Sequence, residues 1–335
     1  MKKHLRLWAA LICLLCLILT LGGCKKKEDP NANKGANGEF KFTKPVTVIV
    51  PFTAGGPTDQ MVRVLQPYLE KQLGVNVIIE NPAGAGGAIG TMEFLSKAPD
   101  GYTIMFGAPT NVVFRPLTSG TDYSYEKDFQ AVSMVASTPI TVAVKENGPY
   151  KDAKTLLEAI KAHPDNFSYA NAGNGSITDV AFQKLLLKAN LKVKAVPFSG
   201  TADGYTAVMG DHVNALVCNL TEATGKEGIH SILNLGSPAN TKEGKEIPTC
   251  DQLGFKDCVT DTFFGFYYTN EVPANAVETF DKAVGTALQD PECVKKYAAI
   301  KQTVTYKNAK DFDAYLRSFI KSTTESLQAL DLLVK

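Results

Sequence analysis

The sequence predicts an α/β fold made of two similar lobes joined by crossover strands. From residue 44 onward, short apolar runs alternate with amphipathic stretches, which is typical of a largely parallel sheet covered by helices. The same alternation begins again near residue 154, so we expect a second lobe. Ligands of such sheets bind at the carboxyl ends of the strands, and the loops there form the candidate site. A chain of 335 residues is long enough for two domains with their own cores.

Residues 1–23 have the three-part form of a secretory signal. Residues 1–6 are basic, residues 7–21 are almost entirely apolar, and small residues precede Cys24. The apolar run is shorter than the roughly 20 residues that cross a bilayer as a helix. An uncleaved membrane anchor is the alternative, and both arrangements place the chain from Lys25 onward outside the cytoplasm. Residues 24–42 are rich in Lys, Asn and Gly, which predicts a flexible tether.

In the first lobe, we expect strands at residues 46–50, 75–80 and 102–106, with helices over 61–73 and 88–97. Two glycine-rich turns connect them, PFTAGGPTD at 51–59 and NPAGAGGAIG at 81–90. Each turn follows a strand and opens a helix, so it offers backbone N–H groups and the positive end of a helix dipole to an anion. Neither turn contains a lysine, which favours a carboxylate over a nucleotide.

The second lobe repeats this pattern after a pair of strands at 131–137 and 140–144. Further strands are predicted at 167–170, 193–196, 213–218 and 229–235. Helices are predicted over 154–162 and 180–189 and from the end of the turn at 197–203 to about residue 209. The turn AGNGSITD lies at 172–179, and PFSGTAD at 197–203 echoes PFTAGGPTD. Residues 236–248 read as a surface loop. A long aromatic strand at 263–269, a helix after Pro273 and a terminal helix over 311–333 complete the chain, and the strands at 140–144 and 263–268 are expected to cross between the lobes.

The composition argues against several functional classes. Loss of Lys2, Lys3 and Arg6 with the signal leaves 32 basic and 34 acidic side chains, a balance that gives no support to nucleic acid as a partner. No G-x-S-x-G, G-x-G-x-x-G or G-x-x-x-x-G-K-[ST] motif occurs, and no histidine has a paired nucleophile, so we expect neither an enzyme nor a bound cofactor.

Cysteine spacing predicts no metal site but leaves one disulfide open. The body retains Cys218, Cys250, Cys258 and Cys293, without the Cys/His spacing of a zinc site. Cys250 and Cys258 could close a short loop outside the cytoplasm, and the sequence does not decide between a disulfide and two free thiols.

Five motifs in order carry a family resemblance: PFTAGGPTD, ENPAGAGGAIG, PDGYT, AGNGS and PFSG. Over residues 44–333 the chain resembles the TctC or Bug substrate-binding receptors of tripartite tricarboxylate transporters. The resemblance implies a type II periplasmic-binding-protein fold, with one lobe of residues 43–142 and 266–335 and another of 143–265. It also implies a monomer that closes on a small carboxylated solute and delivers it to integral membrane permease subunits. A receptor that reports to a membrane sensor and a secreted enzyme that acts on a carboxylate are the alternatives.

The end of the signal, LGGC, resembles a bacterial lipobox. This implies cleavage before Cys24 and acylation of its thiol. The protein would then be extracytoplasmic and lipid-anchored to the bacterial cell membrane.

The resemblance also implies a set of ligand-binding residues in the strand-end turns of both lobes. They are Phe52, Ala54, Gly55, Gly56, Thr58, Asp59, Ala85, Gly86 and Thr110 in the first lobe, and Gly173, Gly175, Ser176, Asp179, Phe198, Ser199 and Gly200 in the second. Thr58 and Ser176 would donate hydroxyl hydrogen bonds, and N-capping of the following helices is the alternative. Asp59 would brace its loop or, if it faced the cleft, bind a ligand ammonium group.

Two departures from the family pattern lower the positive charge near the cleft. Asp179 stands where relatives carry histidine, and Phe198-Ser199 stands where they carry tyrosine and a basic residue. This favours a monocarboxylate, an amino acid or a ligand with an uncharged far end over citrate, unless Arg115 or Lys226 lies in the site. Distal specificity is expected from residues 108–111, 219–224 and 263–268, whose aromatics either contact ligand or form core.

Overall fold

The structure is a computed structural model that describes residues 38–198, 200–238, 245–256 and 258–334. The predicted signal, the lipidation site Cys24 and the candidate ligand residue Ser199 lie outside the described residues. None of the helices in the part of the chain that the structure describes is both long and apolar enough to cross a bilayer.

The first lobe is built on three parallel strands, β1 (Val46–Ile49), β2 (Val77–Glu80) and β3 (Thr103–Gly107). Helices α2 (Pro57–Leu73) and α3 (Ala88–Leu95) connect them. Strand β9 (Asp261–Thr269) and the first half of β4 (Phe129–Lys145) extend the sheet in the order β2-β1-β3-β9-β4, and β10 (Val304–Lys307) pairs with β4. Helices α11 (Ala274–Ala287) and α12 (Pro291–Ala299) pack against α2.

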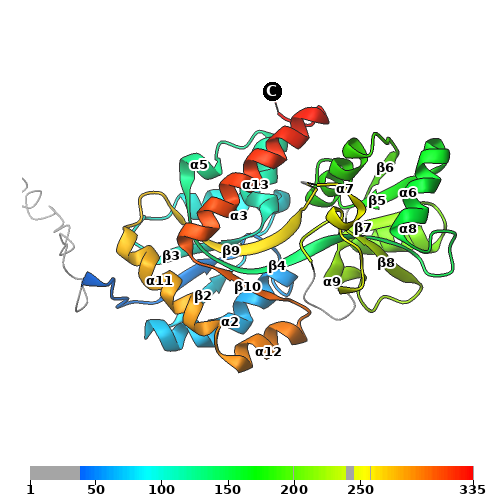
Figure 1. Cartoon of the computed structure of the whole chain (residues 1–335). Helices are drawn as coiled ribbons and strands as arrows, with labels where there is room; N and C mark the ends of the chain where they lie inside the picture. Colours follow the sequence, from blue (N-terminus) through cyan, green and yellow to red (C-terminus); the bar gives the residue numbers. More distant parts are fainter. Residues whose placement is uncertain (1–37, 199, 239–244, 257, 335) are drawn as a thin grey trace, which may run out of the picture.

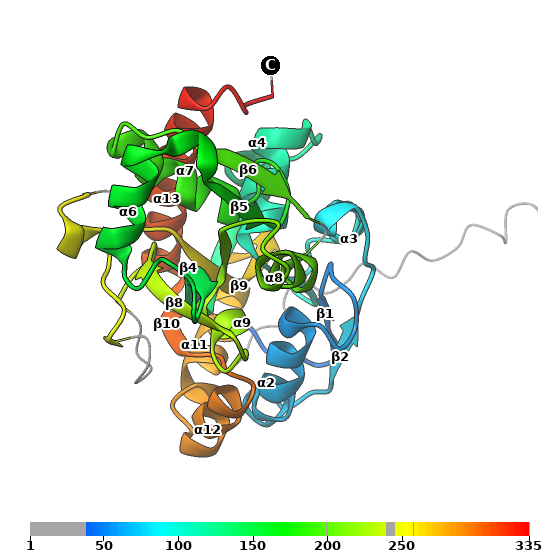
Figure 2. The ribbon, with the colours of Figure 1, turned by 90° about the vertical axis from the view of Figure 1, so that its right-hand side faces the viewer.

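The second lobe repeats this plan. Its parallel strands are β5 (Ser168–Asn171), β6 (Lys194–Pro197) and β7 (Ala215–Asn219), and β7 and β8 (Ile229–Asn234) pair with the second half of β4. The helices are α6 (Ala153–Ala162), α7 (Ile177–Lys188), α8 (Thr201–Met209) and α9 (Leu220–Ala223). Figure 2 looks onto this lobe, with α6, α7 and α8 in front. Both sheets place an antiparallel strand between the parallel triplet and an outer strand, which is the expected type II arrangement.

Strand β4 runs through both lobes without a break, whereas the sequence suggested two strands at 131–137 and 140–144. That prediction was wrong because the strand stays extended through Pro139 and only changes its partner there: Pro139 pairs with Asp261 of β9, and Ile140 pairs with Asn219 of β7. Figure 1 shows β4 and β9 passing between the lobes. Strand β4 exchanges its partner β9 for β7 between Pro139 and Ile140, and the lobe bounds at 142 and 266 stay predictions.

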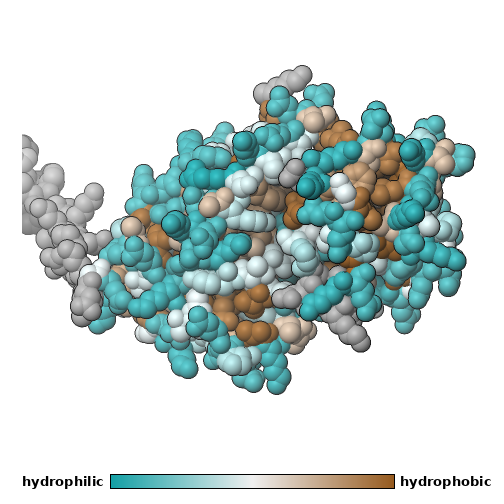
Figure 3. Space-filling model, viewed as in Figure 1, coloured by the Kyte–Doolittle hydropathy of each residue, from teal (hydrophilic) through white to brown (hydrophobic). Residues whose placement is uncertain are grey.

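The C-terminal helix α13 (Ala309–Ala329) packs on β4 and on α7 of the second lobe. Its buried side chains Phe312, Leu316, Phe319 and Leu327 join one hydrophobic core with residues of the second lobe, such as Leu185. In Figure 1 this helix crosses in front of the strands that connect the lobes. The face seen in Figure 3 is mostly hydrophilic, with hydrophobic residues gathered over the second lobe at the right.

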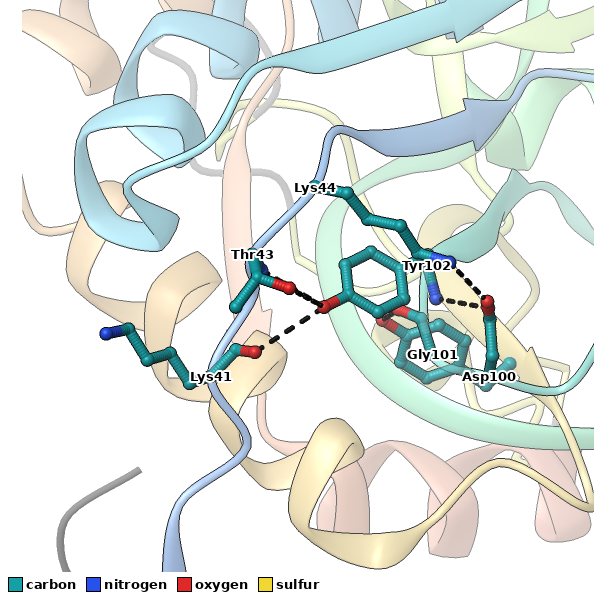
Figure 4. Close-up of polar contacts among 7 residues, drawn as sticks. Lys41, Thr43, Lys44, Asp100, Gly101 and Tyr102 are labelled. Atoms are coloured by element: carbon teal, nitrogen blue, oxygen red, sulfur yellow. Dashed lines mark hydrogen bonds and ion pairs between the residues drawn. The ribbon is translucent and has the colours of Figure 1, made fainter. Parts of the chain in front are cut away.

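The folded body begins before β1. Phe40 and Phe42 are 6% and 5% exposed and pack on Tyr102. The Tyr102 hydroxyl accepts a hydrogen bond from the Thr43 amide at 3.0 Å, and Lys44 Nζ lies 2.9 Å from Asp100 Oδ2 (Figure 4). The end of the segment predicted as a tether, 24–42, therefore belongs to the fold, because two phenylalanines bury there against the PDGYT turn.

Short elements were not expected from the sequence. They include the π-helical turn η3 (Thr110–Phe114), α4 (Arg115–Ser119), α5 (Tyr125–Asp128), α9, α12 and β10. Segments this short contain too few residues to show a clear hydrophobic period. Two of them, η3 and α4, border the candidate site.

Candidate functional site

The candidate site lies at the carboxyl ends of the parallel strands in both lobes. In the first lobe, the loops after β1, β2 and β3 carry the predicted residues from Phe52 to Thr110. In the second lobe, the loops after β5 and β6 carry those from Gly173 to Gly200. The strand order makes the β1–α2 loop equivalent to the β5–α7 loop, and the β2–α3 loop equivalent to the β6–α8 loop.

The loop after β1 is held by Asp59, whose side chain is fully buried. The carboxylate accepts hydrogen bonds from the Gly55 amide at 2.7 Å, from Arg63 Nε at 2.7 Å and from Asn81 Nδ2 at 3.0 Å. Burial alone would raise the pKa of Asp59, but the hydrogen bonds from Arg63, Gly55 and Asn81 outweigh it and hold that pKa below its usual range. Both carboxylate oxygens are therefore used within the loop, which leaves no support for a ligand ammonium group at Asp59.

The loop after β5 is built in the same way around Asp179, which is 3% exposed. Its carboxylate accepts from the Gly175 amide at 2.9 Å, from Asn171 Nδ2 at 3.0 Å and from the Tyr169 hydroxyl at 2.6 Å. Burial and the adjacent carboxylate raise the pKa of Tyr169 well above its usual range, so this hydroxyl stays a donor. Asp179, which the sequence analysis singled out as a departure from the family pattern, thus anchors its own loop.

The two loops share the pattern Gly-[Gly/Ser]-x-Thr-Asp, at residues 55–59 and 175–179. Gly55 and Gly175 both adopt the left-handed conformation, with φ of 80° and 67°. The sequence comparison of PFTAGGPTD with PFSGTAD therefore paired the wrong loops, because PFSGTAD follows β6 and corresponds in topology to the turn after β2.

The first turns of the following helices differ in capping. Gly56 is the N-cap of α2 and supplies no side-chain oxygen, while Pro57 opens the helix. Thr58 lies inside the helix, so the N-capping alternative does not apply to it. Ser176 is the N-cap of α7 and accepts a hydrogen bond from the Asp179 amide at 3.3 Å. The positive end of α2 therefore has no side-chain acceptor at its cap, and an anion would interact favourably with it.

The loop after β2 holds four successive residues with positive φ, 84–87. One of them is Ala85 at 46°, a conformation that L-residues avoid and that tends to occur at ligand sites. A β-carbon on Gly87 would lie 2.8 Å from Asn111 Cβ and 3.2 Å from the Phe52 ring, so the loops after β1, β2 and β3 meet here. A β-carbon on Gly86 would lie 2.5 Å from Nε and Nη2 of Arg115.

Two amide side chains that the sequence reasoning missed connect these loops, the buried Asn111 and the half-buried Asn81. Asn111 Oδ1 accepts from the Ala108 amide at 2.9 Å, and its Nδ2 donates to Thr91 Oγ1 at 3.0 Å. Asn81 also donates to the carbonyl of Phe52 at 3.2 Å. A polar residue directly after an apolar strand was the available signal, since Asn81 and Asn171 both occupy such positions. Thr110, at the start of η3, is half-buried beside this network.

Two described segments approach each other between the lobes at the site. Thr118 of α4 lies close to Gly175, at whose position a β-carbon would be 3.5 Å from Thr118 Cγ2. On the second lobe, the Phe198 amide donates to the Asn171 carbonyl at 3.0 Å, which joins the β5 and β6 loops. Gly200 has extended backbone with φ of 179°.

The segments expected to determine distal specificity lie in different surroundings: the aromatics of 263–268 are in the core, and residues of 219–224 line cavities. The side chains of Phe263, Phe266, Tyr267 and Tyr268 are 0% exposed and form core, so they are not available to a ligand. Residues of 219–224 line cavities of ≈ 800 and ≈ 420 Å³, together with Lys301 and, in the larger one, Thr138 and Asp261. Lys226 lies over the Tyr205 ring beside the smaller cavity. Neither cavity is lined by the glycine turns after β1 or β5.

Cys250 and Cys258 lie together as buried free thiols. The hydrogen bond between them lowers the pKa of Cys258, with Lys188 and Lys184 nearby acting in the same direction. Whether they form a disulfide stays a prediction. Among the described residues, no group of three or more His, Cys, Asp or Glu side chains is placed to hold a metal ion.

Comparisons with known proteins agree with this architecture. The family model described as "Tripartite tricarboxylate transporter family receptor" matches residues 61–332. The protein BugT of Bordetella pertussis is 27% identical over 261 residues, which cover 76% of this chain and 80% of BugT.

Solved structures share the fold. A TctC solute-binding protein from Polaromonas is 23% identical, with a TM-score of 0.76 over 86% of this chain and 99% of that one. MatC from Rhodopseudomonas palustris, solved with bound malate, is 24% identical, with a TM-score of 0.69 over 85% of this chain and 99% of that one. The predicted type II periplasmic-binding fold is confirmed, and the chain belongs to the tripartite tricarboxylate transporter family of receptors.

Proposed function

We propose that this protein is an extracytoplasmic solute receptor that binds a small carboxylated ligand and delivers it to the membrane permease of a tripartite tricarboxylate transporter. The observation that carries the proposal is the pair of equivalent loops, 55–59 and 175–179, one in each lobe. Each loop presents backbone amides at a helix N-terminus and uses its own aspartate internally. Membership of the receptor family and the malate held by its relative MatC support a carboxylate as the ligand.

Residues of the site divide into those that contact ligand and those that hold the loops. We assign ligand contact to the exposed or half-buried positions of both lobes, namely Phe52, Ala54, Gly55, Gly56, Ala85, Gly86, Thr110, Gly173, Ser176, Phe198 and Gly200. Ser199, which lies outside the described residues, stays a proposed ligand contact. The buried Thr58, Asp59, Gly175 and Asp179 act by fixing loop geometry. A loop fixed before the ligand arrives loses less conformational entropy on binding.

Ligand capture proceeds by closure of the two lobes about β4 and β9. A ligand held by the loops of one lobe gains contacts with the other lobe only in the closed form, so its differential affinity shifts the population towards closure. The protein itself carries out no chemistry on the ligand and needs no cofactor. We propose that it acts as a monomer, with the closed surface docking on the permease.

Cys24 is the proposed site of acylation, which would hold the receptor on the outer side of the cell membrane. Cys24→Ser should release the protein from the membrane fraction into the soluble extracytoplasmic fraction. Retention of the variant in the membrane fraction would favour an uncleaved anchor.

The test of the ligand class is a thermal-shift screen of residues 38–335 against mono-, di- and tricarboxylates and amino acids, followed by calorimetric titration. Ligand at 100 times its Kd adds roughly 2.7 kcal/mol to the free energy of unfolding. Failure of every carboxylate to bind would overturn the proposal, and conversion of a carboxylate without a persistent complex would identify an enzyme.

A further inference from the structure

Arg115 differs from the other arginines that the structure describes. Arg63 lies 2.7 Å from Asp59 Oδ2, and Arg317 lies 2.8 Å from Asp313 Oδ2. Among the described residues, no carboxylate pairs with Arg115, and its hydrogen bond there joins Nη1 to Ser119 Oγ at 3.2 Å. The donors at Nε and Nη2 are therefore available to an anion that is not part of the chain.

The guanidinium of Arg115 lies inside the loop cluster of the candidate site. It contacts Gly86, where a β-carbon would be 2.5 Å from Nε and Nη2 and 2.8 Å from Cζ. Gly86 is followed by Gly87, which contacts the Phe52 ring of the loop after β1. Arg115 thus lies beside the loop after β2, which itself meets the loop after β1. Because the residue is half-buried, its side chain is partly shielded from water.

Helix α4 also places Arg115 towards the second lobe. Thr118 lies three residues further along the helix, on the same face as Arg115, and this threonine is the residue that approaches Gly175. Two contacts hold α4 in place: the side chain of Phe114, which precedes the helix, is 3% exposed, and the Leu117 carbonyl accepts a hydrogen bond from the Val334 amide at 2.9 Å.

The charge of Arg115 has no counterpart in the described site. Asp59 and Asp179, the two carboxylates of the glycine loops, are occupied by their own amides and side chains. The loop cluster therefore contains two separate features suited to an anion: the N-terminus of α2 with its loop amides, and the guanidinium of Arg115.

We infer that Arg115 is the specificity-determining residue that binds a second carboxylate of the ligand, while the glycine loops hold the first. This inference rests on the proposed carboxylate-binding function and replaces the expectation of an uncharged far end. That expectation held unless Arg115 or Lys226 lay in the site, and the structure places the Arg115 guanidinium beside Gly86 in the loop after β2. A guanidinium binds a carboxylate through two parallel hydrogen bonds, so it fixes orientation as well as charge.

The test compares dicarboxylates with monocarboxylates of equal chain length by calorimetric titration: succinate with butyrate, glutarate with valerate, and adipate with hexanoate. The proteins are the wild type, Arg115→Gln, Arg115→Lys and, as a control for loss of a positive charge elsewhere, Arg317→Gln. We expect the wild type to prefer a dicarboxylate at least about tenfold. Arg115→Gln should weaken binding of the preferred dicarboxylate by roughly 30-fold, because it removes one partner of a charge pair that is shielded from water.

The same variant should change the affinity for the matched monocarboxylate less than about threefold, and Arg115→Lys should retain part of the preference. Equal weakening of both ligands in Arg115→Gln, or an unchanged dicarboxylate affinity, would overturn the role of Arg115 while leaving the receptor function intact. If none of the six acids binds and the wider screen also yields no carboxylate, the proposed function itself fails.

Discussion

Asp59 and Asp179 occupy equivalent positions in the two lobes, and each accepts a hydrogen bond from the amide of the glycine four residues before it, at 2.7 and 2.9 Å. Asn81, directly after β2, donates a hydrogen bond to Asp59 at 3.0 Å. Asn171, the last residue of β5, donates one to Asp179 at 3.0 Å. The lobes have therefore kept one loop architecture although little of their surrounding sequence is shared. An internal carboxylate sets the shape of each loop and leaves the remaining amides for a ligand.

Loss of either carboxylate should damage binding in the same way. Asp59→Asn and Asp179→Asn each remove a charged acceptor, so we expect a loss of stability of roughly 1–3 kcal/mol and at least about tenfold weaker ligand binding. Urea unfolding and calorimetric titration measure the two effects, with the exposed Asp122→Asn as the control. Lowered stability with unchanged affinity in both variants would show that these loops do not hold the ligand.

Stability should depend on pH through Asp59. Its pKa is lowered in the folded protein, so near pH 4 the unfolded chain binds more protons and stability rises with pH. The contribution is fully present above the unfolded pKa of about 3.9 and is lost as pH falls through the lower folded value. Urea midpoints between pH 3 and 6 should fall less steeply with acid in Asp59→Asn than in the wild type or Asp122→Asn. Parallel curves for all three proteins would contradict this prediction.

Gly86→Ala should displace Arg115. The new methyl group would overlap the guanidinium at 2.5 Å, and φ of 63° adds backbone strain of about 1 kcal/mol. Gly254→Ala is a matched control, since Gly254 has φ of 88° but open space around its position. Both variants should lose similar stability, while only Gly86→Ala should lose dicarboxylate affinity. Equal affinities in the two variants would place Arg115 outside the binding site.

Oxidation should bond Cys250 to Cys258. The buried thiols contact each other and the hydrogen bond lowers the pKa of Cys258, which favours its thiolate. Each thiol loses its proton, and two electrons pass to an extracytoplasmic disulfide oxidant. Closing this short loop adds roughly 2.5 kcal/mol on the chain-entropy model.

Reductant should therefore lower the Tm of the oxidised wild type but not that of the Cys250→Ser/Cys258→Ser variant. Cys218→Ser should leave the response to reductant unchanged. If four thiols of the oxidised protein react with an alkylating agent after denaturation without reductant, no bond has formed.

The sequence was informative wherever a residue's role depended on its local neighbours. Strand and helix alternation predicted the two lobes, and the glycine turns predicted the strand-end loops around Gly55 and Gly175. It was less informative where tertiary packing decides whether a side chain is buried. Phe40 and Phe42 follow a polar segment of the sequence, yet both are buried against Tyr102, and the aromatic residues of 263–268 lie in the core. Arg115 could not be assigned, because its place beside Gly86 depends on how the short segments η3 and α4 leave β3.

Strand β4 has a mechanical consequence for the receptor. Pro139, where the strand exchanges β9 for β7, has no amide hydrogen to contribute to either sheet. Twisting one half of β4 against the other therefore breaks no hydrogen bond donated by that residue, and the ladders on both sides remain whole. Resistance to this twisting should then come from backbone torsion and from the packing of α13 on β4 and on α7 of the second lobe. The C-terminal helix is therefore expected to influence how easily the two lobes move relative to each other.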